Sequence, residues 1–277
     1  EHDTVQGEHN SLVQVDSDTY ALAYAGSGAD GYISTFDISS SGVITAVKTQ
    51  SLGNNLEHDT LQGEFNSLVQ VDSDTYALAY SGSGADGYIS TFDISSSGAI
   101  TAVKTQSLGN NLEHDLAMGR SNSLVQVDSD TYALAYTGDA NDGYISTFTI
   151  SADGSTITEI TSLEHDISNG EHNSLVQVDS DTYALAYTGD STDGFISTFT
   201  ISADGSTITE ITSLEHDTSN VTYNSLVQVD SDTYALAYAG ADGDGFMSTF
   251  TIDTFVAAVE ENKKSSGCYD CIPPTLL

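Results

Sequence analysis

One segment of fifteen residues, NSLVQVDSDTYALAY, occurs five times in the chain, and its copies begin at Asn10, Asn66, Asn122, Asn173 and Asn224. Successive copies start 56, 56, 51 and 51 residues apart. Repeats of this length, built of short strand-like pieces, are typical of β-propellers or solenoids. A feature that is present five times therefore belongs first to the scaffold, whereas a feature that is present once is where individual function can lie.

The alternation of residues within one repeat predicts four short strands. In the fourth repeat we expect strands at residues 174–178, 182–187, 195–201 and 207–214, separated by turns rich in Gly, Asp and Ser. The second of these strands places Tyr and Leu on one face and only Ala on the other, so the bulky ridge of one blade can fill the Ala groove of its neighbour. We therefore predict an all-β, five-bladed propeller of four-stranded antiparallel blades, closed so that no sheet edge is exposed.

The predicted propeller spans residues 1–261, and residues 262–277 are expected to form a linker or tail that leads to further domains. Residues 1–3 match the end of a fourth strand, and they either pair beside the last blade or are the remnant of an upstream repeat. Cys268 and Cys271 are the only cysteines, and both lie in the tail. We expect a local disulfide between them if the protein is extracellular, and binding of a metal with outside partners is the alternative.

The charge of the chain excludes several classes of partner. There are 41 acidic residues against 5 Lys and Arg, a net charge of −36. Such a surface repels nucleic acid and anionic lipid, because binding to both depends on basic residues. The sequence contains no apolar run long enough to span a membrane. We expect no cofactor, and at most loosely held Ca²⁺ or other cations on the acidic surface.

Residues 1 to about 260 resemble the repeats of secreted and surface-exposed bacterial and archaeal β-propeller proteins. The tail segment GCYDCIPPTL, residues 267–276, is similar to a short segment in large cell-surface proteins of ammonia-oxidising archaea. The first resemblance implies the propeller architecture. The second implies an extracellular or cell-surface location and a longer envelope protein.

Two repeated motifs contain residue types that bind metals, and both are interpreted as structural. A Glu-His-Asp triplet ends each fourth strand, and its histidines are His2, His58, His114, His165 and His216. These triplets are expected at the outer rim, too far apart to share an ion, so we predict that the histidines make structural hydrogen bonds. The Asp-Ser-Asp turn lacks the glycine and distal glutamate of a Ca²⁺ loop, and it is expected to bond its own backbone.

Catalytic machinery is not evident in the sequence. The predicted innermost strand presents the same Asn, Ser, Leu, Val and Gln in every blade, whereas five-bladed glycosidases place unique carboxylates there. We therefore predict that the protein is not an enzyme, and a glycan-active hydrolase is the alternative.

Two loops in each repeat differ among the five copies, and both are expected on one face of the propeller. The residue before each repeated Asn should crowd the mouth of the central channel, with the single Arg nearby. The candidate ligand-binding residues are His9, Phe65, Arg120, Ser121, His172 and Tyr223, together with Asp30, Asp86, Asp142, Asp193 and Asp244 of the second loop. Drift of exposed loops is an equal explanation for this variation.

The sequence thus predicts a non-catalytic extracellular module for recognition or structure, such as part of a cell envelope, an adhesin or a surface filament. Rings beside polar groups suit a glycan or another polar ligand. The expected partners are a glycan or a surface protein, or further copies in an envelope or filament.

Overall fold

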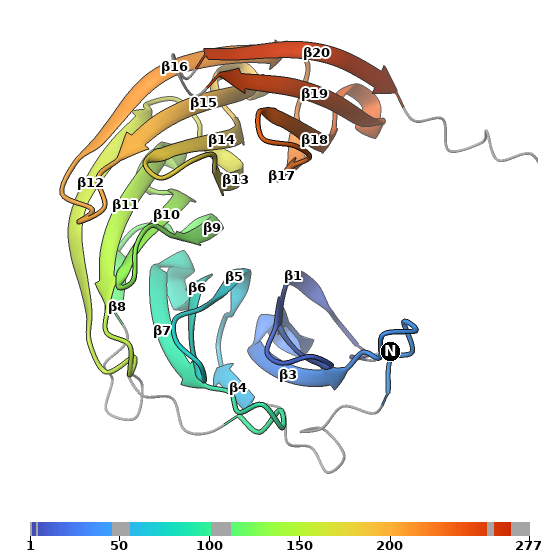
Figure 1. The fold of residues 1–277 in the computed structure, drawn as a ribbon, viewed down its shortest axis with the longest axis vertical. Coiled ribbons are helices and arrows are strands. Elements are labelled where there is room, and N and C mark those ends of the chain that lie inside the picture. Colours follow the sequence, from blue (N-terminus) through green and yellow to red (C-terminus); the bar gives the residue numbers. More distant parts are fainter. Residues whose placement is uncertain (1, 4, 46–55, 101–111, 254–257, 267–277) are drawn as a thin grey trace, which may run out of the picture.

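The computed structural model describes residues 2–3, 5–45, 56–100, 112–253 and 258–266, which form an all-β, five-bladed propeller (Figure 1). Each blade is a four-stranded antiparallel sheet whose strands follow one another in chain order, with the first strand innermost (Figure 1). The predicted fold class is therefore confirmed. The described residues contain no α-helix, and each blade carries one short 3₁₀ turn between its second and third strands.

The strands have nearly the same bounds in each repeat. The strands of the first three blades are β1 (Glu8–Gln14), β2 (Thr19–Ala25), β3 (Gly31–Asp37) and β4 (Leu56–Asp59); β5 (Glu64–Gln70), β6 (Thr75–Ser81), β7 (Gly87–Asp93) and β8 (Leu112–Asp115); and β9 (Arg120–Gln126), β10 (Thr131–Thr137), β11 (Gly143–Ile150) and β12 (Ile157–Asp166). Those of the last two are β13 (Glu171–Gln177), β14 (Thr182–Thr188), β15 (Gly194–Ile201) and β16 (Ile208–Asp217); and β17 (Thr222–Gln228), β18 (Thr233–Ala239), β19 (Gly245–Asp253) and β20 (Ala258–Ser266). The 3₁₀ turns are η1 (Ser27–Ala29), η2 (Ser83–Ala85), η3 (Asp139–Asn141), η4 (Asp190–Thr192) and η5 (Ala241–Gly243).

The core lies between blades, and each interface is a ridge in a groove. Between the third and fourth blades, Ala133, Ala135 and Ile145 of one blade form the floor of the groove. Tyr183 and Leu185 of the next blade lie in it, within a ridge completed by its inner Leu, a second Tyr, Phe and Ile. The same residue types meet at the other three interfaces. The predicted packing of Tyr and Leu against Ala is therefore confirmed.

The constant polar residues of the inner strands join neighbouring blades. The Ser123 Oγ accepts a hydrogen bond of 2.9 Å from the backbone N–H of Leu175 in the next blade, and three equivalent bonds occur at the other interfaces. The Asn122 side chain donates to the carbonyl oxygen of Phe65 in the preceding blade. The repeated Asn and Ser are therefore used by the scaffold, which explains why they do not vary.

The face of the propeller that carries the constant turns is also structural. In the Asp-Ser-Asp turn the first Asp accepts from its own turn backbone, as Asp72 Oδ1 does from the N–H of Ser73 at 2.7 Å. The turns between the third and fourth strands bond to the preceding blade, since Thr147 Oγ1 donates to the carbonyl oxygen of Gly205 at 2.7 Å. The prediction that Asp-Ser-Asp turns bond their own backbone is confirmed.

The five blades form an open arc (Figure 1), which differs from the expected closed ring. Core clusters of the described residues join the first blade to the second and so on to the fifth, and none of these clusters joins the fifth blade to the first. His2 lies against Tyr24 of the first blade, with ring centroids 4.9 Å apart. The short segment at residues 2–3 thus packs on the first blade, and it forms no strand beside β20.

The last blade extends further along the chain than the sequence predicted. Residues 262–266, which we expected in a linker, belong to β20, and Lys264 pairs with Ser248 of β19. Residues 267–277, which include Cys268, Cys271 and the predicted disulfide, lie outside the described residues.

Candidate functional site at the channel mouth

Each inner strand begins with a β-bulge at the residue before the repeated Asn. The backbone φ is positive there in all five blades, at 52° for His9, 53° for Phe65, 52° for Ser121, 54° for His172 and 57° for Tyr223. The strand register shifts at the same place. A left-handed residue other than Gly, Asn or Asp is costly, and bulges often aim a side chain at a functional site.

These bulges bring the five residues together around one cavity of about 280 Å³. Its lining alternates between the bulge residue and the repeated Asn of each blade: His9, Asn10, Phe65, Asn66, Ser121, Asn122, His172, Asn173, Tyr223 and Asn224. The structure therefore places the five residues predicted for the channel mouth side by side. The lining contains no Asp, Glu, Lys, Arg or Cys.

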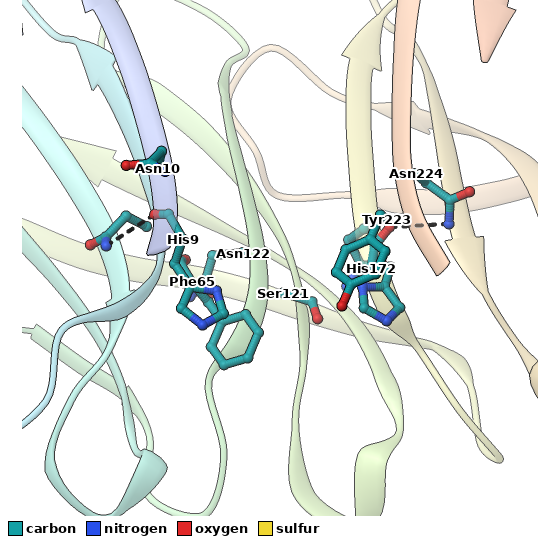
Figure 2. Close-up of a pocket in the computed structure, with 10 residues that line it drawn as sticks. His9, Asn10, Phe65, Ser121, Asn122, His172, Tyr223 and Asn224 are labelled. Atoms are coloured by element: carbon teal, nitrogen blue, oxygen red, sulfur yellow. Dashed lines mark hydrogen bonds between the residues drawn. The ribbon is translucent and has the colours of Figure 1, made fainter. Parts of the chain in front are cut away.

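The rings in the cavity form two pairs, with Ser121 between them (Figure 2). The His9 and Phe65 ring centroids are 4.1 Å apart, and those of His172 and Tyr223 are 4.9 Å apart. The Tyr223 side chain is 75% exposed, which is unusual for a large aromatic residue. Burial lowers the pKa of His172, and the nearby Glu171 carboxylate partly opposes that shift.

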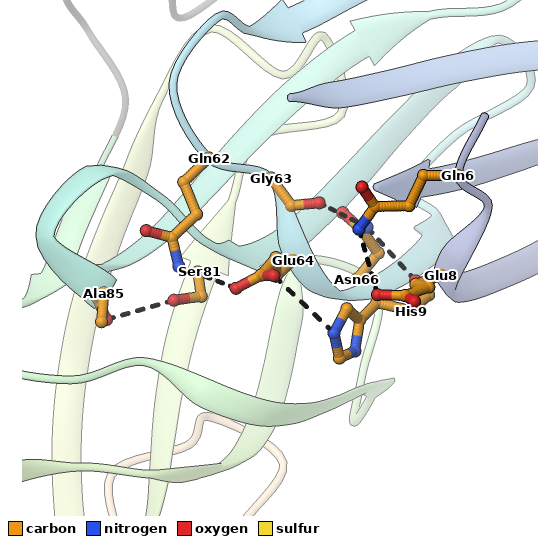
Figure 3. A network of polar contacts seen from close by, with 9 residues as sticks. All are labelled: Gln6, Glu8, His9, Gln62, Gly63, Glu64, Asn66, Ser81 and Ala85. Carbon is orange, nitrogen blue, oxygen red and sulfur yellow. Dashed lines mark hydrogen bonds and ion pairs between the residues drawn. The ribbon is translucent and has the colours of Figure 1, made fainter. Parts of the chain in front are cut away.

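Beside His9 lies a small network of carboxylates and amides from the first two blades (Figure 3). Glu64 Oε1 lies 4.0 Å from His9 Nε2, and Gln62 Nε2 donates to Glu64 Oε2 at 2.9 Å. Gln6 and Glu8 repeat the second contact at 3.1 Å in the first blade. The Glu64 carboxylate thus lies beside the imidazole of His9 and does not line the cavity.

A similar frame supports these loops. In the first four, the Asp of the Glu-His-Asp triplet accepts hydrogen bonds from two loop N–H groups, as Asp166 does from Ser168 at 2.9 Å and Asn169 at 3.2 Å. The loops that lead into the second to fifth blades also bond to the 3₁₀ turn of the preceding blade, as Gly170 N–H donates to the Asn141 carbonyl oxygen. Two glycines meet here, because a Cβ added to Gly170 would lie 2.1 Å from Gly143 Cα.

Three of the triplet histidines are packed rather than hydrogen-bonded, so the predicted hydrogen-bonding role was wrong for these three. His58, His114 and His165 each meet a Tyr and a Phe of the next blade edge-on, at centroid distances of 4.7 to 5.9 Å. Their ring nitrogens are buried and have no hydrogen-bond partner among the described residues. Burial lowers the pKa of all three to about 3, so these imidazoles are neutral. No group of three or more metal-ligating side chains occurs in the described part of the chain.

Six other candidate residues lie outside the cavity lining. Arg120 begins β9 beside Ser121, at the position that Glu occupies in three other blades. The five loop aspartates close the 3₁₀ turns through their backbone, since the carbonyl oxygen of each accepts from the glycine that precedes the turn: Asp30, Asp86, Asp142, Asp193 and Asp244. The structure thus gives these aspartates a backbone role that a loop sequence does not reveal.

A family model that describes lactonases with a seven-bladed β-propeller matches residues 86–228, just over half of the chain. The chain belongs to this lactonase family. Within the matched range lie the two outer strands of the second blade, the whole third and fourth blades and the inner strand of the fifth. No protein with a curated description matches the chain.

Solved structures share the fold of this lactonase-family propeller at low sequence identity. A protein from Lactobacillus plantarum is similar with a TM-score of 0.65 and 13% identity, over 92% of this chain and 69% of that one. A putative 6-phosphogluconolactonase from Bacteroides fragilis has a TM-score of 0.53 and 12% identity, over 92% and 83% of the two chains. A periplasmic gluconolactonase from Pseudomonas aeruginosa has a TM-score of 0.54 and 11% identity, over 92% and 85%. At these identities the likeness shows the fold.

The chemistry available in the cavity is that of contact and hydrogen bonding. Ring faces offer apolar and polarisable surface, while imidazole nitrogens, one hydroxyl and one phenol offer hydrogen bonds. The amide nitrogen of each repeated Asn already donates to the backbone, and the amide oxygens of Asn66, Asn122, Asn173 and Asn224 are buried. Hydrolysis of a glycosidic bond ordinarily uses two carboxylates on either side of the bond, and the lining contains none. No described helix is long and apolar enough to cross a membrane.

Proposed function

We propose that this lactonase-family propeller is a non-catalytic recognition module that binds a glycan, free or on a surface protein, at the channel mouth. The observation that carries the proposal is the pairing of rings, with His9 against Phe65 and His172 against Tyr223, on either side of Ser121. The C–H faces of sugars pack on such rings, and their hydroxyls bond to imidazole and hydroxyl groups.

The charge of the protein favours a neutral ligand. With 41 acidic residues against 5 basic ones, the surface repels anionic sugars such as phosphorylated or acidic ones. Arg120 lies outside the lining, so the cavity itself offers no cation to pair with an anion. A neutral oligosaccharide therefore suits the cavity better than a sugar acid or its phosphate.

The proposal places the protein outside the cell, on its surface or in an envelope, adhesin or filament. Its support is the acidity of the chain, the repeat resemblance to secreted propellers and the open position of the cavity. Loosely held cations would reduce the repulsion between neighbouring loops in such surroundings.

A hydrolase of glycans or lactones is the second candidate, and one contact favours it. The 4.0 Å approach of Glu64 to His9 resembles the way in which a carboxylate orients a general base. The family includes lactonases, and a putative exo-β-1,3-galactanase from Bifidobacterium bifidum is among the similar structures. The cavity offers no second charged group to complete such a reaction.

An array of neutral and acidic glycans, followed by turnover assays on each glycan bound, tests the proposal. We expect binding of neutral glycans without release of product. The matched variant replaces His9, Phe65, His172 and Tyr223 with Ser, the residue that the third blade already carries, and it should lose binding. A control variant, Asp72→Asn with Asp128→Asn in the constant turns, should bind as the parent does. Turnover of a bound glycan, or binding that survives the fourfold Ser change, would overturn the proposal.

A further inference from the structure

The groove of the fifth blade is built like the other four grooves, yet it is exposed. Met247 is 55% exposed, whereas the equivalent Ile196 of the fourth blade is fully buried. Val229 is 62% exposed, and its equivalent Val178 is 9% exposed. Ala237 is exposed as well, although the equivalent alanine is fully buried in each of the other blades.

The ridge of the first blade is exposed along its inner half. Leu12 is 56% exposed, whereas the equivalent Leu68 and Leu226 are 5% and 4% exposed. The outer half of this ridge is covered, because His2 packs on Tyr24 and Phe36 as His58 does on Tyr80 and Phe92. An apolar groove and an apolar ridge thus face the open side of the arc together (Figure 1).

The hydrogen bonds and close contacts that join neighbouring blades are missing, among the described residues, at the groove of the fifth blade and the ridge of the first. Ser174 Oγ accepts from the N–H of Leu226, but the equivalent Ser225 of the fifth blade is exposed. A Cβ added to Gly194 would lie 2.7 Å from His216, whereas one added to the equivalent Gly245 would meet nothing within 4 Å. Both surfaces therefore have the shape and the hydrogen-bonding groups of a blade interface.

We propose that the open side of the arc is a docking surface for two further blades of the same repeat sequence. One blade places its Tyr and Leu ridge in the groove of Val229, Ala237 and Met247, and the other covers Leu12 with its Ala groove. Two observations set the number at two. The family is described as seven-bladed, and 92% of this chain covers only 69% of the Lactobacillus plantarum structure. The added blades also complete the channel mouth with two more bulge residues.

The direct test joins a copy of residues 113–214, which holds two repeats in phase, ahead of Glu1. The chain then has seven repeats, and it is compared with the five-repeat chain. Met247 is the readout at the docking surface, and Met118, between the second and third blades, is the internal control. We expect the rate of Met247 oxidation by peroxide to fall by about tenfold or more in the seven-repeat chain, because burial protects a side chain. The Met118 rate should stay the same.

A matched pair of substitutions tests the same proposal without relying on the rate of Met247 oxidation. Ala186→Leu overfills a covered groove, so it should lower the melting temperature of both chains by about 4 °C or more. Ala237→Leu should leave the melting temperature of the five-repeat chain unchanged. In the seven-repeat chain it should lower the melting temperature as much as Ala186→Leu does.

Three results would overturn the proposal. If the five-repeat chain is a monomer by light scattering and Ala237→Leu destabilises it, the five blades close on themselves. If its mass doubles with concentration and Ala237→Leu reverses the doubling, a second copy covers the surface. If the seven-repeat chain is less stable than the five-repeat chain, or leaves Met247 as reactive as before, two further blades do not fit.

Discussion

Each loop at the channel mouth has two parts, which we call the frame and the tip. They lie within a few residues of each other, yet the frame packs against the scaffold and the tip lines the cavity. The frame is the His packed on the blade, the Asp that caps the loop and, in the second, third and fourth loops, the glycine at the close approach of two backbones. The tip is the bulge residue, which is His, Phe, Ser, His and Tyr in the five blades and lines the cavity. The positions that are constant among the five repeats stabilise the scaffold, and the positions that vary line the cavity.

Acidification should have the largest effect on the frame. His58, His114 and His165 have a pKa of about 3 in the folded protein because burial disfavours their charged form, against about 6.5 in an unfolded chain. Between these values the unfolded chain binds protons that the folded protein does not, so stability falls as the pH falls below about 6.5. Each histidine should cost about 2 kcal/mol at pH 5 relative to pH 8.

Urea unfolding at high salt between pH 8 and pH 5 measures this loss, since salt screens the changing surface charge. His165→Gln removes one titrating ring, and it should reduce the pH-dependent loss by about one third. A free energy of unfolding that stays flat over this range would mean that the histidines are solvated.

Adding one methyl group to the frame should have the next largest effect. A Cβ on Gly143 would lie 2.6 Å from the buried ring of His165, which cannot move away. Gly143→Ala should therefore cost about 3 kcal/mol. The control Gly245→Ala adds the same methyl group at the equivalent place in the fifth blade, where nothing lies within 4 Å. Equal melting temperatures for the two variants would contradict the packing described for the frame.

Changes at the tip should have the smallest effect on stability. Replacing His9, Phe65, His172 and Tyr223 with Ser removes rings that line an open cavity, and the bulge conformation already accepts Ser121 at the same φ. We expect each change to alter the free energy of unfolding by less than about 0.5 kcal/mol, as is usual for surface positions. Chemical denaturation of the variant with all four substitutions measures the sum of these four changes in the free energy of unfolding. A loss as large as that of Gly143→Ala would place the tip within the scaffold.

Most of the fold could be predicted from the sequence, because the five copies of the repeat can be compared with one another. Tyr183 and Leu185 alternate with Ala184 and Ala186, and this alternation alone predicted the ridge and groove found between blades. Closure of the ring did not follow from the same pattern. The angle between blades depends on how ridges seat in grooves, and an identical repeat is compatible with arcs of different curvature.

The site was predicted only in part. The bulge residues were recognised because they vary beside a constant Asn, and the structure brings all five into one cavity. Arg120 and the five loop aspartates were predicted from the same loops, but the structure places none of them in the lining, and the aspartates close the 3₁₀ turns through their backbone. The positive φ at His9 and its equivalents left no trace in the sequence, since the residues there are not Gly or Asn.

The histidines of the chain allow the most direct test of the division between frame and tip. His9 and His172 line the cavity, whereas His58, His114 and His165 are sealed between blades. A proton–carbon NMR spectrum of the histidine rings, recorded while a glycan identified on the array is added, reports on both groups at once. We expect the His9 and His172 signals to move in a saturable manner while the signals of His58, His114 and His165 stay in place. Movement of the buried signals alone, or of none of the five, would contradict it.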